Sequence, residues 1–269
     1  MSKPKTLLTR ISIALLGIPI VLGLLYLGGI YLTIFLILVS TLALRELFDL
    51  LGNKGLPPNR YTTIIAGIIL LLAAGLNRGI IKYVVPLIII MLLLTILIGN
   101  IKDSVKALSA SIFSTVYIPL NLCFVILLRQ IPEIGFQLTI LTFITVWACD
   151  TCAYFFGSWL GRKPLAPKIS PNKSIVGAIA GFAGSILTVF LLYIFKILPD
   201  NLSLFQVLGF GVVIGIFTQI GDLIESVIKR DMEVKDSGSI LLGHGGVLDR
   251  FDSIILVAPV VYLYSILIL

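Results

Sequence analysis

Long apolar segments recur along the whole chain, and they constrain its fold more than any other feature. A helix needs roughly 20 apolar residues to cross a bilayer core of about 30 Å. Nine segments approach that length, at about 11–28, 30–44, 61–76, 82–99, 107–128, 136–160, 175–198, 204–228 and 250–269. Because backbone polar groups in lipid must be paired within the protein, these segments are predicted to be helices. We therefore predict an all-α, polytopic integral membrane protein with about nine transmembrane helices.

The composition excludes the other broad classes of protein. Of the 269 residues, 58% are apolar and 12% are charged, whereas soluble domains average roughly 45–50% apolar and about 25% charged residues. The mean hydropathy of +1.13 points the same way. A soluble globular enzyme of this size would lack polar surface, and a disordered chain would not be so apolar.

The basic residues predict the orientation of the chain in the membrane. Of 20 Lys and Arg residues, 16 fall on the N-terminus and on alternate loops, which places them on one side of the predicted spans. Positive charge accumulates on the cytoplasmic side, so we expect a cytoplasmic N-terminus and an odd number of spans. Membrane topology and anionic ligands account for the net charge of +7 without any nucleic-acid partner.

Charged residues are concentrated near the C-terminus. Seven of the 13 acidic residues lie in 222–252. Asp222, Glu225, Ser226 and Lys229 follow a spacing that places them on one face of a helix. Carboxylates in a span are costly and usually face a cavity or a partner, so this face is either an internally paired polar surface or part of a site.

The segment that follows favours a site for a phosphate-rich ligand. Four basic side chains could neutralise phosphate charge: Lys229, Arg230, Lys235 and Arg250. Gly245 and Gly246 could let backbone N–H groups approach an oxyanion. Asp249 and Asp252 lie three residues apart at the start of the last span, and ionised carboxylates are what magnesium selects. For His244 we rank a hydrogen-bond donor to phosphate above a general acid and a loop anchor. The predicted chemistry is metal-assisted transfer on a phosphate-rich ligand at the cytoplasmic face.

A second basic loop precedes the seventh span. Four basic residues lie there without an acidic one: Arg162, Lys163, Lys168 and Lys173. Ser170, Lys173 and Ser174 bring hydroxyls and an ammonium to the start of a predicted helix, where a phosphate could bind. The preference of cytoplasmic loops for positive charge is the alternative explanation.

These residues resemble the phosphatidate cytidylyltransferases, also called CDP-diacylglycerol synthases. The family pattern reads S-x-x-K-R-x4-K-D, a short glycine-containing spacer, then H-G-G-x-x-D-R-x-D. The chain supplies it with Ser226, Lys229, Arg230, Lys235, Asp236, His244, Gly245, Gly246, Asp249, Arg250 and Asp252. Asp150-x-x-x-Tyr154 and Ser170-Pro171-x-Lys173 are also similar to the family. Asn172 and Val176 stand where the family commonly has lysine and glutamate.

The resemblance implies that CTP and phosphatidic acid are converted into CDP-diacylglycerol and pyrophosphate with Mg²⁺, and that a second cation could also take part. It implies one membrane domain over 1–269, with an N-terminal helical part at 1–140 and a catalytic part at 141–269. Asp222 and Asp249 are the implied metal ligands, with Asp252 as a second-rank candidate. Asp222 and Asp249 are also counted as catalytic with Lys229, Arg230, Lys235 and His244. The implied substrate-binding residues are Ser170, Lys173, Ser174, Ser226, Gly245, Gly246, Arg250, Asp150 and Asp236.

Two other functions share parts of this pattern. A CTP-dependent polyprenol or dolichol kinase would use the same phosphate chemistry but would transfer the γ-phosphate. A cation-coupled transporter could use Asp150 and Asp222 as an ion relay, although transporters often show matched interruptions in both halves of the chain, and the polar clusters here lie in the second half. We expect a homodimer in the cell (inner) membrane, with the active site on the cytoplasmic side.

Overall fold

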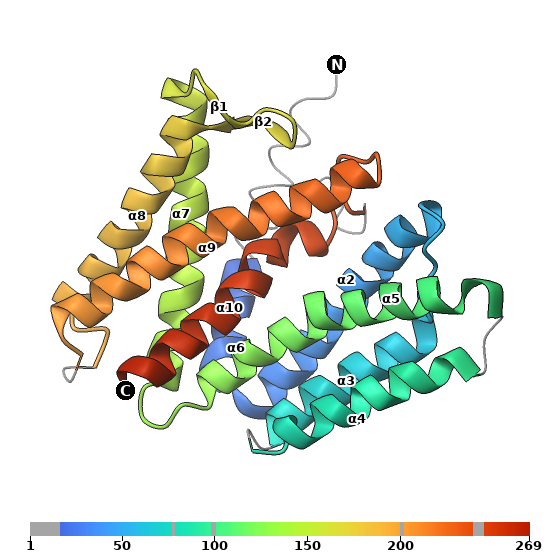
Figure 1. Ribbon diagram of the computed structural model, residues 1–269. Helices are drawn as coiled ribbons and strands as arrows, with labels where there is room; N and C mark the ends of the chain where they lie inside the picture. Colours follow the sequence, from blue (N-terminus) through green and yellow to red (C-terminus); the bar gives the residue numbers. More distant parts are fainter. Residues whose placement is uncertain (1–16, 77–78, 98–100, 200–201, 239–244) are drawn as a thin grey trace. The chain divides into compact units, whose positions relative to one another are not determined.

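A computed structural model describes residues 17–76, 79–97, 101–199, 202–238 and 245–269 (Figure 1). The described residues are helical apart from one short hairpin and the connecting turns, which confirms the all-α prediction. Each of the nine predicted spans contains a helix in this described part of the chain. Five helical segments are long and apolar enough to cross a membrane: Ile101–Arg129, Gly135–Leu160, Ile175–Ile194, Leu204–Asp231 and Leu248–Ile268. Shorter apolar helices occupy Gly17–Leu27, Arg60–Leu76 and Ile81–Leu97.

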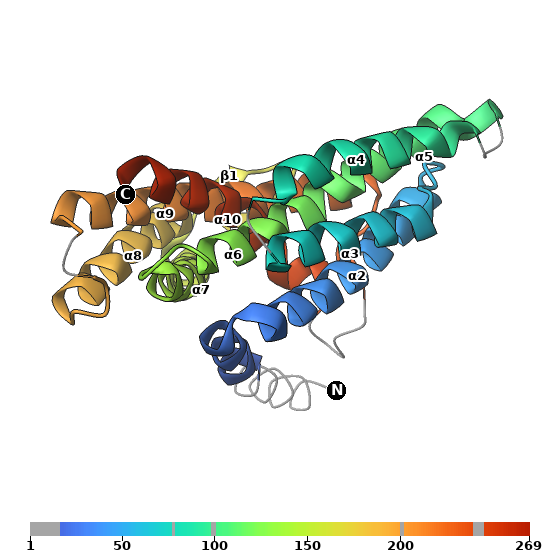
Figure 2. The same ribbon diagram turned by 90° about the horizontal axis from the view of Figure 1, so that it is seen from below.

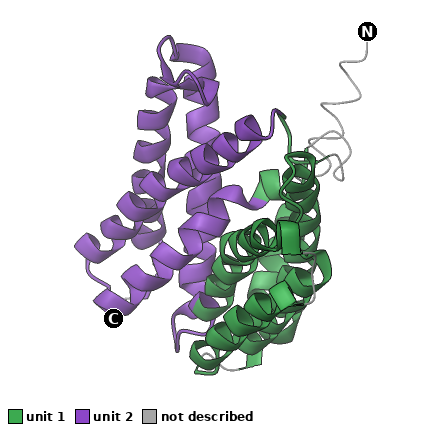
Figure 3. Ribbon diagram, turned by 45° about the vertical axis from the view of Figure 1, so that its right-hand side comes forward, with its two compact units in different colours: residues 1–127, 234–250 green, residues 128–233, 251–269 purple. Residues whose placement is uncertain are grey.

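The chain divides into two compact units, coloured separately in Figure 3. The first unit comprises residues 1–127 and 234–250, and the second comprises residues 128–233 and 251–269. This division is finer than the single membrane domain that the sequence suggested, and the boundary near residue 140 stays a prediction.

The first unit is built on helix α2 (Gly29–Asn53). Apolar residues recur along α2 at helical spacing, and Leu36, Leu44 and Leu47 are fully buried. Helix α3 (Arg60–Leu76) packs along α2, and α4 (Ile81–Leu94) packs along α3 (Figure 2). The remaining helical segments of the unit are η1 (Thr95–Leu97), η2 (Ile101–Asp103), α5 (Ser104–Thr115), the π-helical turn η3 (Val116–Leu120) and the first residues of α6 (Asn121–Arg129).

The second unit brings α7 (Gly135–Leu160), α8 (Ile175–Ile194) and α9 (Leu204–Asp231) together with most of α10 (Leu248–Ile268). Helix α8 packs against both α7 and α9, and α7 also contacts α9 (Figure 1). Glycines make this packing close: a Cβ atom at Gly177 would lie 2.7 Å from the Ala153 carbonyl oxygen, and one at Gly181 would lie 2.9 Å from that of Cys149. Small residues at helix interfaces allow such close backbone approach in membranes.

A short antiparallel hairpin connects α7 to α8. Its strands are β1 (Pro164–Ala166) and β2 (Ser170–Ser174). The sequence predicted a loop that leads directly into a helix, so the pairing of these two strands was not predicted. Helix α8 begins at Ile175, and the preceding Ser174 caps it by accepting a hydrogen bond from the Gly177 N–H at 3.0 Å.

Helices α9 and α10 approach each other just where the acidic residues lie. A Cβ atom at Gly221 would be 3.1 Å from the Asp252 carbonyl oxygen and 3.1 Å from the Ser253 Cα atom. The Ser253 hydroxyl donates to the Thr218 carbonyl oxygen at 3.4 Å. This close contact sets how side chains of the two helices can meet.

Candidate active site

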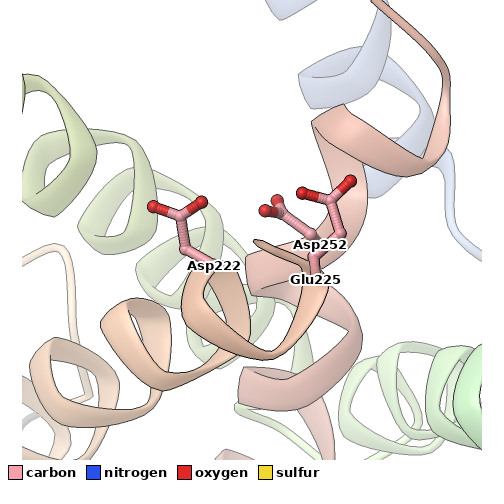
Figure 4. Close-up of side chains that lie close together, drawn as sticks. All are labelled: Asp222, Glu225 and Asp252. Carbon is pink, nitrogen blue, oxygen red and sulfur yellow. The ribbon is translucent and has the colours of Figure 1, made fainter. Parts of the chain in front are cut away.

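Three carboxyl groups gather between α9 and α10 in the second unit. Asp222 and Glu225 come from α9, one helical turn apart, and Asp252 comes from the first turns of α10 (Figure 4). One oxygen of each carboxyl group lies within 4.8 Å of the others. Glu225 is 1% exposed and Asp252 is 7% exposed, whereas Asp222 is partly open to its surroundings. We call these three residues the carboxylate triad.

Two lysines pair with the triad. The Lys173 ammonium of β2 lies 2.6 Å from Asp222 Oδ2, and the Lys229 ammonium lies 2.6 Å from Glu225 Oε2, one turn along α9. The Lys229–Glu225 pair is nearly buried, with 13% and 2% of the two side chains exposed. The sequence spacing predicted the second pair, but only the fold brings Lys173 to Asp222.

The triad and its two lysines carry a net charge of −1 when all five groups are ionised. Carboxylates this close repel one another, and a divalent cation would relieve that repulsion. Carboxylate oxygens are the hard ligands that Mg²⁺ prefers, and it is usually held by one or two of them together with substrate phosphates. The donor set therefore fits magnesium. Asp150 of α7 adds a further negative charge near Asp252.

The hairpin is tied to the end of α9. Arg230 donates a hydrogen bond from Nε to the Ile169 carbonyl oxygen at 3.0 Å. The guanidinium remains exposed. Because Arg230 binds the turn that precedes β2, it also holds the strand that carries Ser170 and Lys173. The hydroxyl of Ser174 is occupied by its capping role, so its contact with phosphate stays a prediction.

The segment before α10 belongs to the first unit and shows a different arrangement. Asp249 accepts hydrogen bonds at Oδ2 from the Gly246 N–H at 2.7 Å and from the Ser237 N–H at 3.1 Å. Its carboxylate thus closes the turn that leads into the helix. The predicted role of Asp249 as a metal ligand is not decided by this geometry and stays a prediction.

Glu46 of α2 is a residue that the sequence analysis did not select. Its carboxylate accepts hydrogen bonds from the Val247 and Leu248 N–H groups, each at 2.9 Å. The N–H groups of Gly246, Val247 and Leu248 therefore donate to protein carboxylates. An acidic residue in a largely apolar helix was the available signal, because such residues usually face a polar partner.

The other predicted site residues differ in how far their side chains are exposed. Ser226 is buried on α9, and Ser170 is half-buried. Those with exposed side chains are Asp150, Lys235, Asp236 and Arg250. Gly245 has a φ of 79°, the left-handed conformation that favours glycine. His244 lies outside the described residues.

Comparisons with known proteins identify the family. A sequence profile described as the cytidylyltransferase family matches residues 8–268. The chain belongs to this family. A phosphatidate cytidylyltransferase of Synechocystis is 34% identical over 288 residues, covering 97% of both chains. Enzymes of the same name from Staphylococcus haemolyticus and Staphylococcus aureus are 34% and 33% identical, and each match covers 93% of this chain and 95% of the relative. These relatives span nearly the whole chain and favour a transferase over a transporter.

Proposed function

We propose that this protein transfers the cytidylyl group of CTP to phosphatidic acid and so makes CDP-diacylglycerol and pyrophosphate. One observation carries the proposal: a carboxylate triad with two buried members and two paired lysines lies in a membrane protein of the cytidylyltransferase family. The full-length relatives named phosphatidate cytidylyltransferase support the choice of substrates.

The carboxylate triad is the proposed magnesium site. Asp222, Glu225 and Asp252 would hold the ion, so Glu225 joins two of the ligands expected from the sequence. When bound, the ion would neutralise charge on the phosphates of the nucleotide. Asp249 stays in the proposed site as the residue that closes the turn at Gly246.

Basic side chains would bind the phosphates. Lys173 and Lys229 now neutralise triad carboxylates. If a cation takes over that neutralisation, both ammonium groups become available to phosphate oxygens. Arg230, Lys235 and Arg250 have exposed charges and would bind further phosphates of CTP or of the lipid. Ser170, Ser226, Gly245, Gly246, His244, Asp150 and Asp236 complete the proposed set.

The reaction needs no strong general base. An oxygen of the lipid phosphate attacks the α-phosphorus of CTP, and the bond to the bridging oxygen of the β-phosphate breaks. Pyrophosphate leaves with the electron pair of that bond. Because the attacking oxygen is already ionised at neutral pH, the main tasks of the site are to hold the two phosphates together and to offset their charge.

We place the site on the cytoplasmic side of the cell (inner) membrane. The support is the excess of Lys and Arg on one set of loops, which includes the hairpin and the segment before α10. A reporter fused after Leu269 should then lie on the opposite side. We also propose a homodimer, which chemical cross-linking in native membranes would test.

A product assay tests the function directly. Purified protein in vesicles is given either phosphatidic acid or a polyprenol, together with CTP labelled on the α- or the γ-phosphate, with and without Mg²⁺. We expect α-label in the lipid, γ-label in pyrophosphate, and both only with magnesium. Transfer of the γ-label to a polyprenol would instead identify a lipid kinase. Absence of lipid labelling with phosphatidic acid would overturn the proposal.

A further inference from the structure

Glu46 is a buried carboxylate that the proposed chemistry does not use. It lies in helix α2 of the first unit and is 3% exposed. Burying a carboxyl group is costly unless hydrogen bonds replace those it made with water. At a position with no structural task, an apolar residue would serve α2 better. The groups that hydrogen-bond to Glu46 should therefore show why a carboxylate occupies this buried position.

Among the described residues, the hydrogen-bond partners of the Glu46 carboxylate lie at Ser237, Val247 and Leu248, around the start of α10. Oε1 accepts a hydrogen bond from the Val247 N–H at 2.9 Å, and Oε2 accepts from the Leu248 N–H at 2.9 Å and from the Ser237 hydroxyl at 3.1 Å. The first N–H groups of a helix have no partner within the helix, and they carry its positive end. Glu46 thus caps α10 from a helix that lies about 200 residues earlier in the sequence.

Two glycines fit tightly against the same carboxylate. A Cβ atom at Gly238 would lie 2.6 Å from Glu46 Oε1, which is far inside van der Waals contact. A Cβ atom at Gly246 would collide with Glu46 Oε2 and with the Ser237 hydroxyl. The second glycine of the Gly245-Gly246 pair is therefore required for the contact with Glu46, independently of any contact with phosphate.

We propose that Glu46 is a positioning residue for the transfer reaction. Its carboxylate fixes the start of α10, and the first turns of that helix carry Asp249 and the triad residue Asp252. Because α10 is one continuous helix, releasing its start would let Asp252 move. The inference rests on the proposed function for its kinetic part, and on the hydrogen bonds alone for its structural part.

The test compares Glu46→Gln with Asp49→Asn. Glutamine keeps the size of the side chain but replaces one accepting oxygen with an NH₂ donor, which opposes a donor of the segment. Asp49 lies one turn further along α2, and its exposed carboxylate pairs with Arg60 at 2.7 Å, so its neutralisation is a matched control. We expect Glu46→Gln to lower kcat by about ten-fold or more and to raise the magnesium concentration for half-maximal rate, because a hydrogen bond to a charged group is lost.

Hydrogen exchange of the substrate-free protein provides a second readout. In Glu46→Gln the amides of Val247 and Leu248 should exchange at least about ten-fold faster, whereas Asp49→Asn should match the unmodified protein. Ser237→Ala removes one donor and should change both readouts in the same direction by less, so it carries the test if Glu46→Gln does not fold. Unchanged exchange and unchanged magnesium dependence in Glu46→Gln would overturn the inference. Failure of the unmodified protein to label phosphatidic acid would instead overturn the proposed function. The hydrogen-exchange measurement would still test whether Glu46 fixes the start of α10.

Discussion

Replacing Gly221 with alanine tests whether the contact of α9 with α10 sets the geometry of the triad. The added Cβ atom would lie 3.1 Å from two backbone atoms of α10, the Asp252 carbonyl oxygen and the Ser253 Cα atom. Ordinary contact begins at 3.4 Å, so α10 must move away by about 0.3 Å. A misplacement of 1 Å in a site can cost roughly 100-fold in rate. Scaled to this displacement, the expected loss of kcat is about four-fold.

The assay is cytidylyl transfer to phosphatidic acid over a range of magnesium concentrations. Because the displacement separates Asp252 from Asp222 and Glu225, the magnesium concentration for half-maximal rate should rise together with the loss of kcat. Gly23→Ala is the matched control: outside the backbone of its own helix, no atom of the residues that the structure describes lies within 4 Å of an added Cβ atom there, so the variant should behave as the unmodified protein. Normal kcat and normal magnesium dependence in Gly221→Ala would refute the argument that this helix contact positions the triad.

Three further predictions concern single side chains. Asp252→Asn should lower kcat by at least about 100-fold in protein that still inserts into the membrane, since it removes a triad carboxylate; an active variant would exclude Asp252 as a ligand. Asp249→Asn should also abolish turnover, and comparing its hydrogen exchange near Gly246 with that of Asp252→Asn separates loss of the turn from loss of a ligand; full activity would remove Asp249 from the site. Lys106→Ala should stay within about two-fold of the unmodified rate, because the Lys106–Asp103 pair, at 3.5 Å, is more than half exposed and such pairs contribute little; a large loss would show that the site extends to α5.

Local patterns were enough to predict the helices. Hydropathy located nine helical segments, because a chain in lipid must satisfy its backbone within each span. The spacing of Asp222, Glu225 and Lys229 also predicted their common face, since helical periodicity is a local property. The start of α10 near residue 250 followed from the change from polar to apolar sequence. The hairpin at Pro164–Ser174 was missed, because its strands are short and carry no alternating apolar pattern.

The choice of partners was decided by the tertiary structure. The sequence ranked Asp249 above Asp252 as a metal ligand, yet Asp252 joins the triad while Asp249 accepts hydrogen bonds from two backbone amides. Their spacing does not predict this outcome, because it depends on what lies beside each residue: Gly221 of α9 packs against Asp252 and Ser253, whereas the amides of Ser237 and Gly246 lie beside Asp249. Lys173 and Glu46 meet partners 49 and about 200 residues away. Periodicity fixes which side chains share a face of one helix, but only the packing of one element on another decides what that face meets.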